Sequence, residues 1–115
     1  MSVYEPEAGD LVWTDFDPQL GREQSGRRPA LVLSPVAFWR ATAFAFLAPI
    51  TSRVRPFLSS IVLPDGLRIS GEVMLGQTRS IDTLARPILY SGNRIGVDLL
   101  ADARTKLALL LGIEV

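Results

Sequence analysis

Apolar and polar positions along the chain predict a series of short strands followed by a single helix. Alternating or continuous apolar runs predict strands at 11–16, 29–34, 43–48, 59–63, 72–81 and 87–90, and a short helical turn at 36–41. From 98 to 111 the apolar side chains recur at helical spacing instead, and Gly112 follows as a C-cap. Many short strands with one terminal helix indicate a mainly β fold, a small and strongly bent β-barrel or paired sheet.

Glycine and proline positions refine this pattern. Pro29 fits only at the first residue of a strand or on an edge, because proline has no amide hydrogen for the ladder. Gly76 lies inside the predicted strand 72–81 and indicates a bend or bulge there. The run Ser91-Gly92-Asn93 predicts a turn after the last strand.

Composition sets the class of protein. The chain has 115 residues, 48% hydrophobic and 21% charged, which predicts one globular domain over residues 1–115. Neither histidine nor cysteine occurs, so thiolate and imidazole metal sites, disulfides and His-dependent catalysis are excluded. No signal peptide is expected from the acidic start of the chain, and the longest apolar run, 41–50, is far short of the roughly 20 residues of a membrane helix. We therefore expect a cytoplasmic protein.

The charges are segregated although the formal net charge is zero. Residues 1–20 contain five acids and no base, whereas 21–55 contain six arginines and only one acid, Glu23. Eleven of the twelve basic residues are arginine, whose planar guanidinium binds phosphate through two hydrogen bonds and stacks on bases. This pattern is consistent with a basic face for nucleic acid, although composition alone favours ordinary solvated surface charge, since most surface charges contribute little.

Polar side chains gather at the predicted strand ends. No phosphate-binding glycine motif and no metal-ligand spacing is present. The candidates that remain are an arginine at a strand start, hydroxyls at a strand end, and two clusters of polar residues: Arg28, Thr51, Ser52, Glu23, Gln24, Gln77, Thr78, Arg79 and Ser80. A barrel end would bring such residues together.

Three segments in order resemble the motifs of the MazF/PemK family of toxin endoribonucleases. The first is GDLVWTDFDPQLGREQSGRRPALVLSP at 9–35, the second is PITSR at 49–53, and the third is GEVMLGQTRSID at 71–82. The terminal IGVDLLADARTKLALLLGI, at 95–113, is similar to the last helix of that family. The resemblance covers nearly the whole chain, and its first motif is highly specific.

This resemblance implies a homodimeric SH3-like barrel with a C-terminal helix. It also implies a toxin that cuts single-stranded RNA, mRNA in most members, without a metal or other cofactor. The ends left are a 2′,3′-cyclic phosphate and a 5′-hydroxyl. The implied partner is a cognate antitoxin that blocks the site with an acidic C-terminal segment.

The family's essential arginine corresponds to Arg28, its hydroxyl to Thr51, and the glutamate of its first loop to Glu23. RNA contacts are expected at Gln24, Arg27, Ser52, Arg53, Gln77, Arg79 and Ser80. The chemistry suits these roles, because the guanidinium of Arg28 stabilises a dianionic phosphorane and Thr51 donates a hydrogen bond to the same phosphate. Glu23 is the candidate base for the 2′-hydroxyl.

Other interpretations stay open. Arg28 is also suited to a salt bridge with Asp15, Thr51 to a turn, and Glu23 to an exposed surface position. The same barrel also occurs in toxins that bind and poison DNA gyrase without nuclease chemistry. Those proteins use C-terminal helix residues, so the paired Arg28 and Thr51 favour the nuclease. A catalytically inactive copy that captures antitoxin is the weakest alternative.

Overall fold

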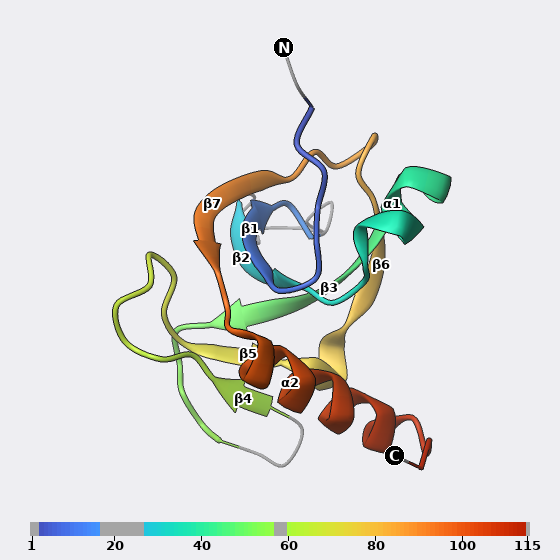
Figure 1. Cartoon of the computed structure of the whole chain (residues 1–115). Coiled ribbons are helices and arrows are strands. Elements are labelled where there is room, and N and C mark those ends of the chain that lie inside the picture. The colour runs from blue at the N-terminus through green and yellow to red at the C-terminus, as the bar shows by residue number, and fades with distance from the viewer. Residues whose placement is uncertain (1–2, 17–26, 57–59, 115) are drawn as a thin grey trace, which may run out of the picture.

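A computed structural model describes residues 3–16, 27–56 and 60–114. Two helices, one 3₁₀ turn and seven strands make up this part of the chain (Figure 1). The elements in order are β1 (Asp10–Thr14), β2 (Arg28–Val32), α1 (Val36–Thr42), β3 (Phe44–Thr51), β4 (Ser60–Val62), β5 (Glu72–Met74), η1 (Leu75–Gln77), β6 (Arg79–Asp82), β7 (Leu89–Arg94) and α2 (Val97–Leu110).

The strands form one bent antiparallel sheet in the order β4-β5-β3-β2-β1-β7, and β6 also pairs with β3. Both β5 and β6 pair with β3, β6 along Phe44–Leu47 and β5 at Ile50 and Thr51. No pairing of β4 with β7 is seen among the described strands, so the barrel is open there. The mainly β fold with a C-terminal helix is as the sequence predicts.

Two hydrophobic clusters lie on opposite faces of the central strands. In β3, Ala48 and Ile50 belong to the larger cluster, which α2 covers through Ala103. Ala45 and Leu47 alternate with them and belong to the second cluster, together with Phe16. This alternation follows from the two-residue period of a strand, and it fixes which side chains share a face.

Two local predictions are wrong. The run 72–81 is not one strand, because η1 separates β5 from β6 and turns the chain at Gly76. The bend predicted at Gly76 is present, but it is a 3₁₀ turn that ends one strand and precedes another, rather than a bulge within one strand. Residues 91–93 do not form a turn after the last strand, since β7 continues to Arg94 with Gly92 at φ +92°. Glycine tolerates that backbone conformation, and the ladder with β1 shifts register nearby.

The helix α2 ends as predicted. Gly112 has φ +78°, and the amide of Ile113 donates to the carbonyl of Ala108, which together make a Schellman C-cap. The apolar stripe of α2 is only partly covered, because Leu110 and Leu111 at its end are exposed. In the described segments no helix is long and apolar enough to cross a membrane.

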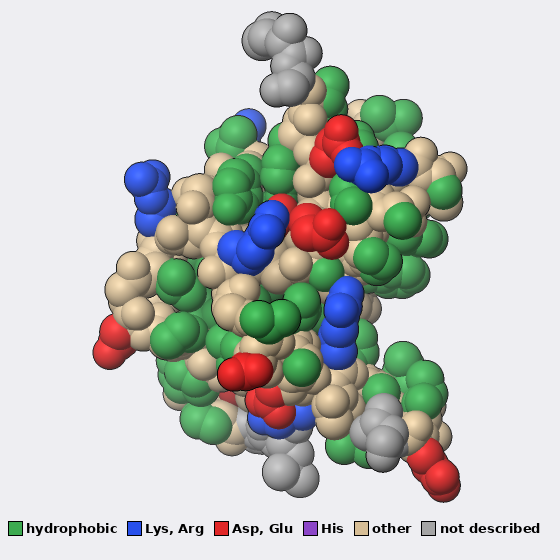
Figure 2. All heavy atoms as spheres, viewed as in Figure 1, with side chains coloured by type: hydrophobic (Ala, Val, Ile, Leu, Met, Phe, Trp, Pro, Cys, Tyr) green, Lys and Arg blue, Asp and Glu red, His purple; other side chains and the backbone are tan. Residues whose placement is uncertain are grey.

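Charge is evenly mixed on the face that α2 crosses. Figure 2 shows basic and acidic side chains next to one another there, with hydrophobic side chains between them. Arg40 of α1 and Glu5 form an ion pair at 2.6 Å. The face that Figure 2 shows carries no basic patch of the kind that the sequence indicates.

Candidate nucleic-acid interface and active site

Arg28 begins β2 and Thr51 ends β3, and because these two strands are antiparallel neighbours, both residues lie at the same end of the pair. The ladder between β2 and β3 reaches Ala30 opposite Pro49, and Arg28 and Thr51 each follow two residues beyond it. Both side chains follow the alternation of the second cluster, in which Ala30 and Leu47 are buried, so they share one face of the sheet. Arg28 is exposed and Thr51 is half-buried.

Pro29 restricts the backbone of Arg28, because the residue before a proline is confined to extended conformations. Pro29 occupies the second position of β2 rather than the first, one residue later than the sequence indicated. On its other side Arg28 faces Thr14 of β1. No ion pair joins Arg28 to Asp15, both of which are described, so the salt-bridge interpretation of Arg28 has no support.

Thr51 ends β3 and starts the segment that carries two arginines. Its Oγ1 accepts a hydrogen bond from the backbone amide of Arg53, at 3.2 Å. The hydroxyl of Thr51 is thus oriented by its own loop and still has its hydrogen to donate. The turn role of Thr51 is real and is compatible with a role toward substrate.

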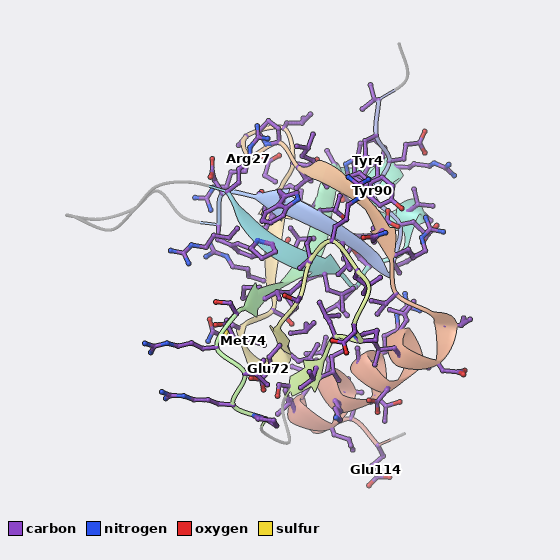
Figure 3. All side chains as sticks on the ribbon, turned by 90° about the vertical axis from the view of Figure 1, so that its left-hand side faces the viewer. Tyr4, Arg27, Glu72, Met74, Tyr90 and Glu114 are labelled. Carbon is purple, nitrogen blue, oxygen red and sulfur yellow. The ribbon has the colours of Figure 1, made fainter. Side chains whose placement is uncertain are left out.

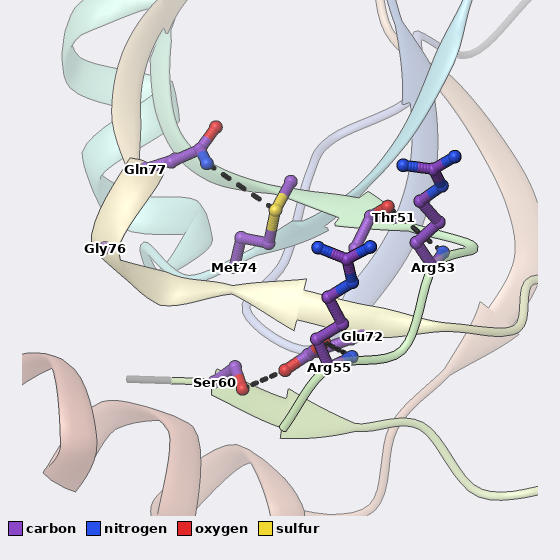
Figure 4. A pocket seen from close by; sticks show the side chains of 8 residues that line it. All are labelled: Thr51, Arg53, Arg55, Ser60, Glu72, Met74, Gly76 and Gln77. Carbon is purple, nitrogen blue, oxygen red and sulfur yellow. Dashed lines mark hydrogen bonds between the residues drawn. The ribbon is translucent and has the colours of Figure 1, made fainter. Parts of the chain in front are cut away.

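A pocket of about 280 Å³ opens beside Thr51 (Figure 4). Two arginines, three uncharged polar side chains and a buried acid contribute to its wall, and the lining residues are Thr51, Arg53, Arg55, Ser60, Glu72, Met74, Gly76 and Gln77. Figure 4 shows Gln77 and Met74 on one side of the pocket, with Arg53 and Arg55 on the other. Such a pocket, apolar at Met74 and cationic at its rim, suits a nucleobase with its phosphate.

The sequence motifs did not single out Glu72, which is only 2% exposed. It pairs with Thr51 in the ladder between β3 and β5. Its Oε1 accepts a hydrogen bond from the amide of Arg55 at 2.7 Å, and its Oε2 accepts one from the hydroxyl of Ser60. The only sequence signal for Glu72 is an acidic residue at the start of an apolar strand. The hydrogen-bond partners of Glu72 depend on the strand register, which the sequence does not specify.

The predicted RNA contacts are only partly brought together. Arg53 and Gln77 line the pocket, and Ser52 is exposed between Thr51 and Arg53. Arg79 is half-buried at the start of β6 with its guanidinium 6.0 Å from the ring centre of Phe16. Ser80 pairs with Phe46 and follows the opposite alternation, so it lies on the other face of the sheet from Thr51.

Three predicted residues lie at or beyond the edge of what is described. Arg27 is exposed directly before β2 (Figure 3). Glu23 and Gln24 lie outside the described residues. The roles assigned to them stay predictions. Within the described segments no three acidic side chains are grouped closely enough to hold a metal ion.

A second buried acid organises the other end of the molecule. Asp10 accepts hydrogen bonds from the hydroxyl of Tyr4 and from Arg94 Nε, the latter at 2.7 Å. Burial, then the hydrogen bond to Asp10, raises the pKa of the Tyr4 hydroxyl above its ordinary value. The same bond to Asp10 raises the pKa of Arg94. Figure 3 shows Tyr4 stacked beside Tyr90, well apart from Glu72 and Met74, so this network anchors the N-terminal segment.

Comparison with known proteins points to one family. Residues 7–111 match the family described as PemK-like, MazF-like toxin of type II toxin-antitoxin system. The chain belongs to this family. It is 35% identical over 112 residues to the endoribonuclease toxin MazF of Escherichia coli K12, covering 97% of this chain and 99% of that protein. Endoribonuclease PemK of Escherichia coli is 38% identical over 85 residues, covering 70% of this chain and 63% of PemK.

Solved structures of the MazF family superpose closely. A MazE-MazF complex from Deinococcus radiodurans (form II) contains a chain that is 43% identical, with a TM-score of 0.88, covering 97% of this chain and 100% of that chain. MazF alone from the same organism gives 43% identity and a TM-score of 0.85, covering 96% of this chain and 100% of that one. The family and the endoribonuclease class predicted from the sequence motifs are thereby confirmed.

Proposed function

We propose that this family member cleaves single-stranded RNA, mRNA foremost, at short sequence motifs without a metal ion. The 2′-hydroxyl attacks the adjacent phosphorus and the bond to the 5′ oxygen breaks, which leaves a 2′,3′-cyclic phosphate and a 5′-hydroxyl. The observation that carries this proposal is the shared face of Arg28 and Thr51, beside a pocket rimmed by Arg53 and Arg55.

Each part of the reaction has a candidate group. The fixed charge of Arg28 stabilises the dianionic phosphorane, and the Thr51 hydroxyl donates to one of its oxygens. Glu23 takes the proton of the 2′-hydroxyl in this scheme. Arg53 and Arg55 bind the flanking phosphates, while Met74 and Gln77 face a neighbouring base across the pocket.

The partners follow from the same proposal. The solved relatives include MazE-MazF complexes, and we extend to this chain a cognate antitoxin whose acidic C-terminal segment covers Arg28, Arg53 and Arg55. A homodimer is proposed as well, supported by exposed apolar side chains around the end of α2: Leu109, Leu110, Leu111 and Ile113. Cleavage of mRNA would take place in the cytoplasm.

The test is incubation of the purified protein with a long single-stranded RNA in the presence of EDTA. Removing a preorganised donor at a developing charge costs about 3–4 kcal/mol, so Arg28→Ala should lower the rate by roughly two to three orders of magnitude. Arg40→Ala is the matched control, because Arg40 lies in α1 and pairs with Glu5. It should cut like the wild type.

Discrete cuts that end in cyclic phosphate, in EDTA and dependent on Arg28, would support the proposal. Cleavage that needs an added metal, or that survives in Arg28→Ala, would contradict the mechanism. A folded wild type that leaves RNA intact would contradict the function itself, and binding to DNA gyrase would then be measured.

A further inference from the structure

Glu72 is a buried acid that the proposed reaction does not use. A carboxylate that is 2% exposed is costly to bury unless hydrogen bonds compensate the lost hydration. Both oxygens of Glu72 accept hydrogen bonds, and among the donors in the described chain are the amide of Arg55 and the hydroxyl of Ser60, which both follow Thr51 in sequence. The carboxylate thus ties down the segment that begins at the active-site threonine.

The segment 51–56 is held at successive points. The amide of Arg53 donates to Thr51 Oγ1, and two residues later the amide of Arg55 donates to Glu72 Oε1. Further along the chain, Lys106 Nζ of α2 donates to the carbonyl of Ser60 at 3.1 Å, at the start of β4. The backbone is restrained while the side chains of Arg53 and Arg55 stay exposed at the pocket. Figure 4 shows both side chains directed to the same side of the segment that follows Thr51.

We propose that Glu72 is a positioning residue for RNA binding: its carboxylate holds Arg55, and with it the segment after Thr51, in the conformation that binds substrate phosphates. The inference rests on the proposed RNA cleavage. Preorganisation lowers the ordering cost of binding, because Arg55 needs to order only its side chain when RNA arrives. Glu72 acts through Arg55 and does not contact the reacting atoms.

The variants separate positioning from proton transfer. In Glu72→Gln the amide oxygen still accepts from the Arg55 amide, and the Ser60 hydroxyl can turn to accept from the new NH₂ group. Glu72→Ala leaves both donors without their acceptor. We therefore expect Glu72→Ala to raise KM for a short RNA by about five-fold or more, with a smaller change in kcat, and Glu72→Gln to restore most of the wild-type value. The pH dependence of kcat should be the same in wild type and Glu72→Gln.

A double-mutant cycle tests the route through Arg55. Arg55→Ala should weaken RNA binding in the wild type and have little further effect in Glu72→Ala, since the guanidinium is no longer held in place. Ser60→Ala, a smaller change, should give a weaker rise in KM. Hydrogen exchange gives a readout that needs no RNA: the Arg55 amide should exchange slowly in wild type and Glu72→Gln, and faster in Glu72→Ala.

The outcomes are distinct. The inference is overturned if Glu72→Ala binds RNA as well as wild type, or if the effects of Arg55→Ala and Glu72→Ala simply add. Glu72→Gln as inactive as Glu72→Ala, with an altered pH profile, would make Glu72 a proton acceptor instead. A wild type that does not cut RNA at all overturns the proposed function, whereas an active wild type with unaffected variants overturns only this inference. Thermal unfolding of each variant identifies loss of fold.

Discussion

Gly71 packs against the backbone of Thr51 so closely that a Cβ atom on Gly71 would overlap the Thr51 carbonyl oxygen and lie 3.0 Å from its carbonyl carbon. Gly71 also has φ +128°, a conformation that side chains disfavour. The residue directly before Glu72 thus lets β5 approach the end of β3. The position of the candidate catalytic hydroxyl depends on this close approach.

Gly71→Ala should therefore destabilise the protein by about 1–3 kcal/mol, from strain at φ and from displacement of Thr51. Activity should fall further than stability accounts for, because the Thr51 hydroxyl moves relative to Arg28. Urea unfolding and single-turnover cleavage at a temperature where both proteins are folded measure the two effects.

Gly76→Ala is the matched control for that substitution. Gly76 belongs to the same motif and lines the same pocket, but nothing lies within 4 Å of a Cβ atom there. Its stability should match the wild type within about 0.5 kcal/mol. Equal losses in the two variants would show that the close packing at Thr51 has no special role.

Most of the fold could be predicted from the sequence, and the reasons are local. Strand alternation and turn residues located β1, β2 and β4 closely, and the helical spacing with Gly112 located α2 and its cap. The prediction failed at 72–81 and at 91–93, where neighbouring strands decide the conformation. The ladder with β1 carries β7 through Gly92, and the packing of η1 divides β5 from β6.

The candidate site residues also divide into those that local sequence identifies and those that only the folded structure brings together. Arg28 and Thr51 are predicted as site residues from their motifs, because each lies in a contiguous and specific run of residues. Glu72 could not be predicted in this way, since the proposed role rests on hydrogen bonds to Arg55 and Ser60, 17 and 12 residues away in sequence. Ser80 is the opposite case. It belongs to a motif, but strand alternation directs it to the opposite face of the sheet from Thr51.

The hydroxyl of Thr51 should matter in a way that its methyl group does not. Thr51→Ser keeps both the acceptor for the Arg53 amide and the hydrogen for the phosphate, so its kcat should stay within a few-fold of the wild type. Thr51→Val preserves the shape but removes both, and kcat should fall by roughly 10²-fold. Single-turnover cleavage of one RNA compares the two. Equal activity of Thr51→Val and wild type would exclude a role for the hydroxyl.

Burial of the Tyr4 hydroxyl, together with its hydrogen bond to Asp10, predicts a loss of stability at alkaline pH. The pKa of Tyr4 is raised in the folded state, so its contribution is fully present below the unfolded pKa of about 10 and is lost as pH rises above it. Tyr4→Phe should lower the free energy of unfolding by about 1–2 kcal/mol at pH 8, and by less at pH 11. Urea unfolding at both pH values measures this.

Tyr90→Phe is the control, because Tyr90 stacks on Tyr4 while the hydroxyl of Tyr4 is the one that donates to Asp10. That variant should keep the alkaline loss of the wild type. A Tyr4→Phe protein that loses stability between pH 8 and 11 as steeply as wild type would show that the hydrogen bond to Asp10 is not its source.

Arg53 and Arg55 predict how RNA affinity responds to salt. Each phosphate contact on a single strand contributes about 0.7 to the slope of log affinity against log salt, through release of counterions. Arg53→Ala and Arg55→Ala should each reduce that slope by about this amount and weaken binding at low salt more than at high salt. Fluorescence anisotropy with a short RNA measures the slope, on an Arg28→Ala background in which cleavage is slow compared with the measurement. Arg40→Ala removes the same charge from α1, where Arg40 pairs with Glu5, and should leave the slope unchanged. A slope that falls equally in all three variants would indicate a general charge effect rather than contacts at the pocket.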